Sequence, residues 1–195
     1  VRVDVSLRRL VHYTGSDWRH VQPWILLTNY HRYVDQFIKW SLAQLQEQNA
    51  YQSLILPGDI VIKRGMNAEE AAALIAQSMW HRFQMPAYHL TTTRGQGVTL
   101  VNIGVGPSNA KTITDHLAVL RPNCWLMVGH CGGLRQTQQI GDYVLAHAYL
   151  RQDNILDDIV PPEVPIPALA EIPVASQDAA KIITGESGAA LKQRF

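Results

Sequence analysis

Short apolar runs alternate with longer amphipathic segments along this chain. Trp24–Asn29 is an apolar run that ends in polar residues, which is typical of a buried strand. His31 to about Gln48 follows with apolar residues mostly three and four positions apart, and this spacing predicts a helix. Ser53–Lys63 reads as an extended segment that Pro57 and Gly58 interrupt.

The next segment carries the signals of a helix start. Asn67 suits the N-cap position, and Glu69 and Glu70 in the first turn complement the helix dipole. We expect this helix to run to about Gln84 and to stop before Pro86, because the residue before a proline disfavours the helical conformation.

Two strands, a helix and a third strand are predicted next. Ala87–Thr93 and Gly97–Val105 flank the turn Arg94-Gly95-Gln96 and predict a hairpin. A helix is expected over Asn109–Leu120, and Trp125–Val128 is apolar throughout, as in a buried strand.

The last third has a weaker pattern. Asp142–Tyr149 alternates in character and predicts a strand, whereas the proline-rich Asp153–Pro173 has no period and is interpreted as a surface loop. From Pro173 a helix is expected through Ile183, with Gly185 ending it.

Alternating strands and helices predict an α/β fold with a mixed, largely parallel central sheet flanked by helices, in a single domain over residues 1–195. The chain is 47% hydrophobic and 17% charged, as in a core-forming globular protein. Its formal charge of +1 argues against a nucleic-acid surface. The sequence shows no apolar run long enough to span a bilayer and no signal peptide, so neither a membrane partner nor secretion is expected. With only two cysteines, a disulfide or zinc site is not expected, and we predict a cytoplasmic protein.

Three turns that follow predicted strands carry candidate ligand contacts. After the first strand, the hydroxyl of Thr28, helix N–H groups and the guanidinium of Arg32 together suit an oxyanion such as phosphate. The plainer alternative is a helix cap with a solvated arginine. After the second, Gly104 and Gly106 permit close backbone approach, and Ser108 or Asn109 can cap the next helix. This is not a dinucleotide motif, because Asn109 fills the last glycine position.

The third turn is Gly129-His130-Cys131-Gly132-Gly133. A strand as apolar as WLMV does not need a histidine and three glycines merely to turn, so we favour a ligand-facing turn. A cysteine–histidine nucleophile pair is disfavoured, since neighbours on an extended chain point to opposite faces. The sequence has no recognised metal, P-loop or G-x-S-x-G motif, and no metal or organic cofactor is indicated.

Several motifs, in order, resemble one enzyme family. They are LVHYTG, LLTNYHRYVDQF, QMPAYHL, GQGVTLVNIGVGPSNAKTITDHLAVLRP, WLMVGHCGGL and IGDYVLAHAYLR. Together they resemble the catalytic domain of bacterial AMP nucleosidases, within the nucleoside phosphorylase superfamily. The resemblance implies hydrolysis of AMP to adenine and ribose 5-phosphate, with AMP and phosphate as ligands.

The resemblance also implies roles for individual residues. Arg32, four positions after Thr28, matches the arginine that binds phosphate in the phosphorylases, and Gly104 matches the next glycine turn. His12 matches a histidine that reaches the 5′ end of the sugar from a neighbouring subunit, so a homo-oligomer, by resemblance a hexamer, is expected. His130, Cys131 and Gly132 match the turn beside the ribose and base.

Two departures from the phosphorylases change the expected chemistry. Met127 and His130 stand where phosphorylases have an arginine and a serine that bind the attacking phosphate. Because a thioether cannot bind an anion, hydrolysis is favoured over phosphorolysis. The plainer alternative is that any buried strand tolerates a methionine. The 5′-phosphate needs a further cation, for which Arg8, Arg9 and Arg64 are candidates.

The family's ribose-binding Met-Glu motif and its catalytic acid are expected beyond Phe195, in a part of the catalytic domain that this chain lacks. The chain begins with Val1 and lacks the family's N-terminal regulatory domain, so we expect a fragment with cut ends and little turnover by itself. The alternatives are another purine nucleoside phosphorylase or hydrolase of the superfamily, and a non-catalytic nucleotide-binding module.

Overall fold

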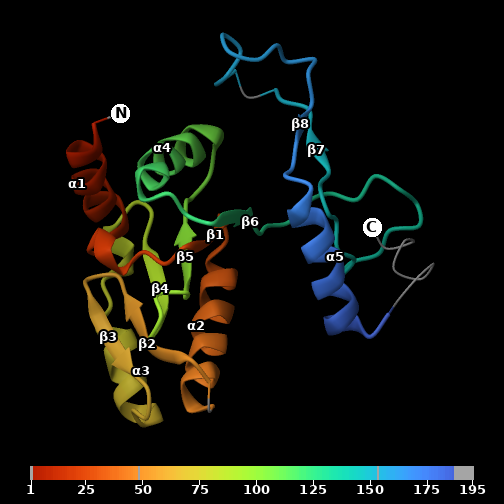
Figure 1. Cartoon of the computed structure of the whole chain (residues 1–195). Coiled ribbons are helices and arrows are strands. Elements are labelled where there is room, and N and C mark those ends of the chain that lie inside the picture. The colour runs from red at the N-terminus through yellow and green to blue at the C-terminus, as the bar shows by residue number, and fades with distance from the viewer. Residues whose placement is uncertain (1, 48, 153, 187–195) are drawn as a thin grey trace. The chain divides into compact units, whose positions relative to one another are not determined.

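A six-stranded sheet with helices on both faces forms the first of two compact units, Val1–Gly129 and His130–Phe195 (Figure 1). The computed structural model describes residues 2–47, 49–152 and 154–186. The expected α/β fold with a mixed central sheet is confirmed. That the whole chain is one partial domain stays a prediction.

The sheet combines a parallel and an antiparallel part. Its order is β3 (Ile60–Lys63), β2 (Tyr51–Leu56), β4 (Ala87–Thr92), β5 (Val98–Asn102), β1 (Trp24–Thr28) and β6 (Cys124–Met127). β1 pairs in parallel with β5 and β6, whereas the β2–β3, β2–β4 and β4–β5 pairs are antiparallel. The expectation of a largely parallel sheet is therefore wrong. Short connections join β2 to β3 and β4 to β5, and a short connection permits only antiparallel pairing.

One apolar core lies between the sheet and helices α2 (His31–Gln46) and α3 (Ala68–Gln77). Val34, Phe37 and Leu45 of α2 pack there against strand residues such as Leu54 and Leu100. The apolar positions three and four residues apart in α2 thus lie on the side of the helix that packs against the sheet, and the predicted helix is confirmed.

A second core lies on the other face, beneath α1 (Val3–Thr14) and α4 (Pro107–Leu117). Ile25 and Leu27 of β1 and Val101 of β5 pack there with Leu10 of α1 and Ile113 of α4. Leu100 and Val101 belong to opposite cores because successive strand side chains point to opposite faces.

Several element boundaries differ from the sequence prediction. Asn67 caps α3 as expected, its Oδ1 accepting from the Glu70 N–H at 2.8 Å, but the helix ends at Gln77 instead of about Gln84. Ser78 turns into extended backbone, and its buried hydroxyl donates to the Pro57 carbonyl at 3.3 Å. A short 3₁₀ helix, η2 (Trp80–Arg82), follows. The helix predicted to reach Gln48 is described to Gln46, and Gln48 lies outside the described residues.

β6 is an edge strand, and the prediction that it is fully buried is wrong. Trp125 and Met127 keep 38% and 45% of their surface exposed. They share a face with Ile25 and Leu27, their partners in register on β1. Ile113 and Leu117 of α4 pack in the core over β1 and β5. The apolar face of β6 lies beyond this core, so α4 does not bury it.

In the second unit, β7 (Ala148–Tyr149) pairs antiparallel with β8 (Ile166–Pro167), and α5 (Glu171–Thr184) follows. Residues 142–147, predicted as strand, form irregular backbone with a bend at His147, so only the last two positions of that prediction hold. None of these six residues is buried, so no core selects one face of the segment. α5 begins two residues before Pro173 and ends at Gly185 in the left-handed conformation, as expected. Asp153, where the predicted loop starts, and Phe195 lie outside the described residues.

Candidate functional site

The three parallel strands, β1, β5 and β6, end together at one side of the sheet. We call the carboxyl ends of these strands, with the turns that follow them, the parallel edge. Thr28 at the end of β1 is in register with Asn102 at the end of β5, and Leu27 is in register with Met127 at the end of β6. Ligands of open α/β sheets bind beyond such carboxyl ends. The turns predicted after the strands of residues 24–29, 97–105 and 125–128 therefore begin at the same edge of the first unit.

The turn between β1 and α2 supplies donors and a cation. Thr28 is fully buried, its Oγ1 accepts from the Tyr30 N–H at 3.3 Å, and its carbonyl accepts from the Ile103 N–H at 2.8 Å. No side chain caps the N-terminus of α2, which begins at His31. Arg32 is exposed in this first turn, and across the described ranges the structure gives it no hydrogen bond or ion pair. Uncapped N–H groups and a free guanidinium suit an oxyanion.

His31 is a feature of this edge that the sequence did not single out. Its ring stacks on Trp80 of η2 with centroids 4.1 Å apart, and its Nε2 lies 3.5 Å from Asp35 Oδ1. Its Nδ1 is buried without a hydrogen-bond partner among the residues that the structure describes. No periodicity could reveal the contact, because Trp80 lies in a segment that was predicted as helix and is a short 3₁₀ turn.

The turn between β5 and α4 is built on glycine. Gly104 and Gly106 have φ of 66° and 108°, a region that other residues rarely adopt. Asn102 Oδ1 accepts from the Gly104 N–H at 3.2 Å. The expectation that Ser108 or Asn109 caps the helix is wrong: Gly106 is the N-cap, and Pro107 opens the helix.

The end of β6 adjoins the first turn. The Val128 N–H donates to the Leu27 carbonyl at 2.8 Å, so the chain still follows β1 at this point. A Cβ placed on Gly129 would lie 3.5 Å from Asn29 Oδ1 and 3.9 Å from Met127 Cε. His130, Cys131 and Gly132 begin the second unit and are exposed, and Cys131 carries a free thiol. Their expected place beside the other turns stays a prediction.

His12 lies exposed in the last turn of α1. Its ring stands edge-on to Tyr13 with centroids 5.4 Å apart, and Tyr13 stacks on His116 of α4 at 6.0 Å. Among the described residues, no hydrogen bond or ring contact joins His12 to Thr28, Arg32 or Gly104. Its expected contact with the ligand of a neighbouring subunit stays a prediction.

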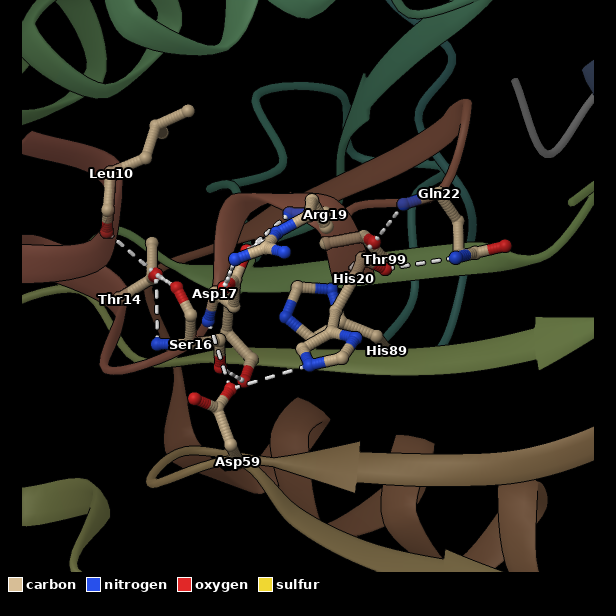
Figure 2. A network of polar contacts seen from close by, with 11 residues as sticks. Leu10, Thr14, Ser16, Asp17, Arg19, His20, Gln22, Asp59, His89 and Thr99 are labelled. Atoms are coloured by element: carbon tan, nitrogen blue, oxygen red, sulfur yellow. Dashed lines mark hydrogen bonds and ion pairs between the residues drawn. The ribbon is translucent and has the colours of Figure 1, made fainter. Parts of the chain in front are cut away.

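A separate polar network fastens the connection between α1 and β1 to the sheet (Figure 2). Asp59 Oδ1 accepts from the Asp17 N–H at 2.9 Å and lies 3.6 Å from His20 Nε2. The His20 ring lies 6.2 Å from that of His89, which is fully buried on β4. Burial, and to a smaller extent the neighbouring His20, lower the pKa of His89 to about 3. The ring is therefore neutral at physiological pH.

His89 is held by a threonine that serves two partners. Thr99 Oγ1 lies 2.9 Å from His89 Nδ1 and also accepts from the Gln22 N–H at 2.8 Å. Gln22 Oε1 in turn accepts from the Gly97 N–H at 3.1 Å. These bonds join the connection to β4 and β5 and satisfy Thr99, Gln22 and the Nδ1 of His89. The buried Nε2 of His89 has no partner among the described residues.

A cavity of about 440 Å³ lies elsewhere, between α2, β3 and α3. Its lining is mostly apolar and includes Leu42, Leu45, Ile62, Met66 and Ile75. Its polar lining residues are Gln46, Lys63 and Asn67. Gln46 Nε2 already donates to the Met66 carbonyl and Asn67 Oδ1 accepts from the Glu70 N–H, so the parallel edge is the better candidate. Among residues 2–47, 49–152 and 154–186, no cluster of histidine, cysteine and acidic side chains could hold a metal ion. None of the helices in the described part is long and apolar enough to span a membrane.

Comparison with known families places most of the chain in one superfamily. The family model of the phosphorylase superfamily matches residues 59–193, which include the turns after β5 and β6. The chain belongs to the phosphorylase superfamily.

Individual relatives refine the position within the superfamily. The chain is 56% identical over all 195 residues to AMP nucleosidase of Escherichia coli, and it spans 40% of that relative's length. It is 23% identical over 154 residues to uridine phosphorylase of Thermococcus kodakarensis, covering 76% of this chain and 56% of that one. The resemblance to AMP nucleosidases that the motifs indicated is thereby confirmed.

Two solved structures share the fold. The crystal structure of AMP nucleosidase from Bacteroides thetaiotaomicron matches with a TM-score of 0.67 at 25% identity, covering 96% of this chain and 65% of that one. Purine nucleoside phosphorylase from Toxoplasma gondii matches with a TM-score of 0.57 at 17% identity, covering 85% of this chain and 54% of that one.

Proposed function

We propose that this chain is part of an enzyme that hydrolyses the N-glycosidic bond of AMP to adenine and ribose 5-phosphate. The observation that carries the proposal is the 56% identity with E. coli AMP nucleosidase over the whole chain. An N-glycosidase must hold the ribose and its phosphate while the base leaves and water attacks. The parallel edge has features that suit the first of these tasks.

In this proposal Thr28, Arg32 and Gly104 contact the substrate. The free N–H groups at the start of α2 and the unpaired guanidinium of Arg32 support an oxyanion there. Gly104 leaves its backbone open to close approach. Met127, with its thioether at the end of β6, supports hydrolysis over attack by phosphate, since it cannot hold an anion.

His130, Cys131 and Gly132 are proposed to lie beside the ribose and base, and His12 beside the sugar of a neighbouring subunit in a homo-oligomer. Among the arginines considered for the 5′-phosphate, Arg64 is the weakest candidate. Its Nη2 donates to the Asn49 carbonyl at 2.7 Å and to Asn49 Oδ1 at 2.6 Å. Arg8 and Arg9 are exposed on α1, as His12 is, and stay candidates. We assign no residue of this chain as the acid for the leaving base.

Hydrolysis is best tested in a chimaera, because the chain spans 40% of the E. coli relative. These 195 residues would replace the matching segment of the E. coli enzyme, and adenine release would be measured by chromatography from AMP and from adenosine, with and without phosphate. The proposal predicts release from AMP without a need for phosphate. Release from adenosine that requires phosphate would indicate a nucleoside phosphorylase instead.

A folded chimaera that binds AMP and releases no adenine would indicate a binding module. The unmodified E. coli enzyme is the control for the assay. The 195-residue chain alone serves for binding measurements, in which Arg32→Ala tests the proposed oxyanion contact.

A further inference from the structure

Asn29 has an unmet hydrogen-bonding need at the parallel edge. Its Oδ1 is buried from solvent and has no hydrogen-bond partner in the described part of the chain. Two other side chains of these turns are satisfied: Thr28 Oγ1 accepts from the Tyr30 N–H, and Asn102 Oδ1 accepts from the Gly104 N–H. His31 Nδ1, at the start of α2, is also buried without a partner among the described residues. Leaving a buried acceptor unpaired is costly, so a carboxamide kept in this state points to a group that binds it.

The position of the carboxamide shows where that group would lie. Asn29 follows directly on β1, and its Oδ1 lies 3.5 Å from where a Cβ of Gly129 would be. Met127 Cε is the next atom met at that place, at 3.9 Å. The acceptor thus lies near the ends of β1 and β6, close to a glycine and a thioether. Neither neighbour can donate a strong hydrogen bond through its side chain.

The chemistry of the missing partner follows from the acceptor. A carbonyl oxygen needs a donor, and phosphate oxygens without hydrogen cannot supply one. A sugar hydroxyl can. Arg32, two residues into α2, offers the complementary cation for an anionic group. The parallel edge therefore offers the Asn29 carbonyl oxygen to a hydroxyl group and the Arg32 guanidinium to an anion. A sugar phosphate carries both of these groups.

We propose that Asn29 is a ligand-binding residue whose carboxamide accepts a hydrogen bond from a pentose hydroxyl of the sugar phosphate bound at this edge. The inference rests on the proposed function, because it takes ribose 5-phosphate as the ligand. It adds a residue that selects for the sugar rather than for its phosphate.

The test compares binding with stability in the 195-residue chain. Asn29→Leu keeps the approximate volume and removes the unpaired acceptor. Dissociation constants would be measured by NMR titration with ribose 5-phosphate and with inorganic phosphate, and thermal unfolding would be followed alongside. We expect affinity for ribose 5-phosphate to fall about fivefold to tenfold, as for loss of one hydrogen bond. Affinity for inorganic phosphate is expected to stay the same.

The unfolding temperature of Asn29→Leu is expected to stay the same or rise, because an unsatisfied polar group is removed. A structural role would instead lower it. Asn123→Leu is the matched control: Asn123 is exposed just before β6, at the opposite end of the strand. It is expected to change neither affinity.

The outcomes separate the two proposals. If the unsubstituted chain does not bind ribose 5-phosphate, the proposed function fails at this edge and the inference fails with it. If the chain binds ribose 5-phosphate and Asn29→Leu binds it equally well, only the role of Asn29 is overturned. An equal loss for ribose 5-phosphate and inorganic phosphate would also overturn selection for the sugar.

Discussion

Replacing His89 with glutamine is expected to remove much of the acid sensitivity of this protein. The ring is fully buried on β4, its Nε2 has no hydrogen-bond partner, and the other histidine ring of the network, His20, lies 6.2 Å away. Desolvation is the main cause that lowers the pKa of His89 from 6.5 to about 3. The folded protein therefore resists a proton that the unfolded chain accepts.

Proton linkage gives the sign and size of the effect of His89 on the free energy of unfolding. Between pH 6.5 and about 3 the unfolded state binds the extra proton, so the free energy of unfolding falls as the pH falls. Each pH unit below 6.5 costs about 1.4 kcal/mol, and by pH 5.0 the loss from this one group is about 2 kcal/mol. Above pH 7 the contribution vanishes because His89 is neutral in both states.

Urea unfolding at pH 7.5 and 5.0, followed by tryptophan fluorescence, measures this difference. All five tryptophans lie within residues 18–125, so the signal reports on the first unit. His89→Gln is expected to lose about 2 kcal/mol less than the unsubstituted chain between the two pH values. His81→Gln, which replaces an exposed histidine, is the control and keeps the original dependence. An equal loss in His89→Gln and the unsubstituted chain would refute the argument.

Three further substitutions test other parts of the structure. Tyr88→Phe removes a buried hydroxyl that has no partner and is expected to raise the free energy of unfolding by about 1 kcal/mol in urea titrations; a clear loss would mean that the hydroxyl is bonded. Gly97→Ala would place a Cβ 2.0 Å from the Leu90 carbonyl oxygen, and a loss of about 2 kcal/mol or more is expected by the same method, with unchanged stability contradicting the packing. Arg32→Ala is expected to weaken binding of AMP to the chain about tenfold or more in calorimetry with unchanged unfolding, and Arg94→Ala on the β4–β5 turn is its exposed control; equal affinities would remove Arg32 from the site.

Local patterns predicted most elements of the first unit. The run WILLTN, the cap at Asn67 and the turn at Gly95 each act over a few residues, and the strand, helix start and hairpin that they indicate are present. The helix predicted to Gln84 failed because Ser78 bonds to Pro57, a residue distant in sequence. The prediction that β6 is fully buried was wrong for a similar reason. An apolar strand has the same sequence pattern at the centre and at the edge of a sheet.

The candidate site was predictable only in part. Polar and glycine residues after strands indicated the turns, and strand register then brought Thr28 and Asn102 to one edge. The sequence could not show that Asn29 Oδ1 lacks a partner or that His31 stacks on Trp80, because both depend on segments that meet only in the fold. The alternation of strand side chains does place Asn29 on the same face as Leu27, which is the signal that could have singled it out.

The most direct test of the central claim is an NMR titration of the 195-residue chain with AMP, read out at the backbone amides. The account predicts that the largest shifts fall on residues 29–32, 103–106 and 128–129, the turns that follow β1, β5 and β6. Shifts confined to the cavity between α2 and α3, or none at saturating AMP, would contradict a nucleotide site at the parallel edge.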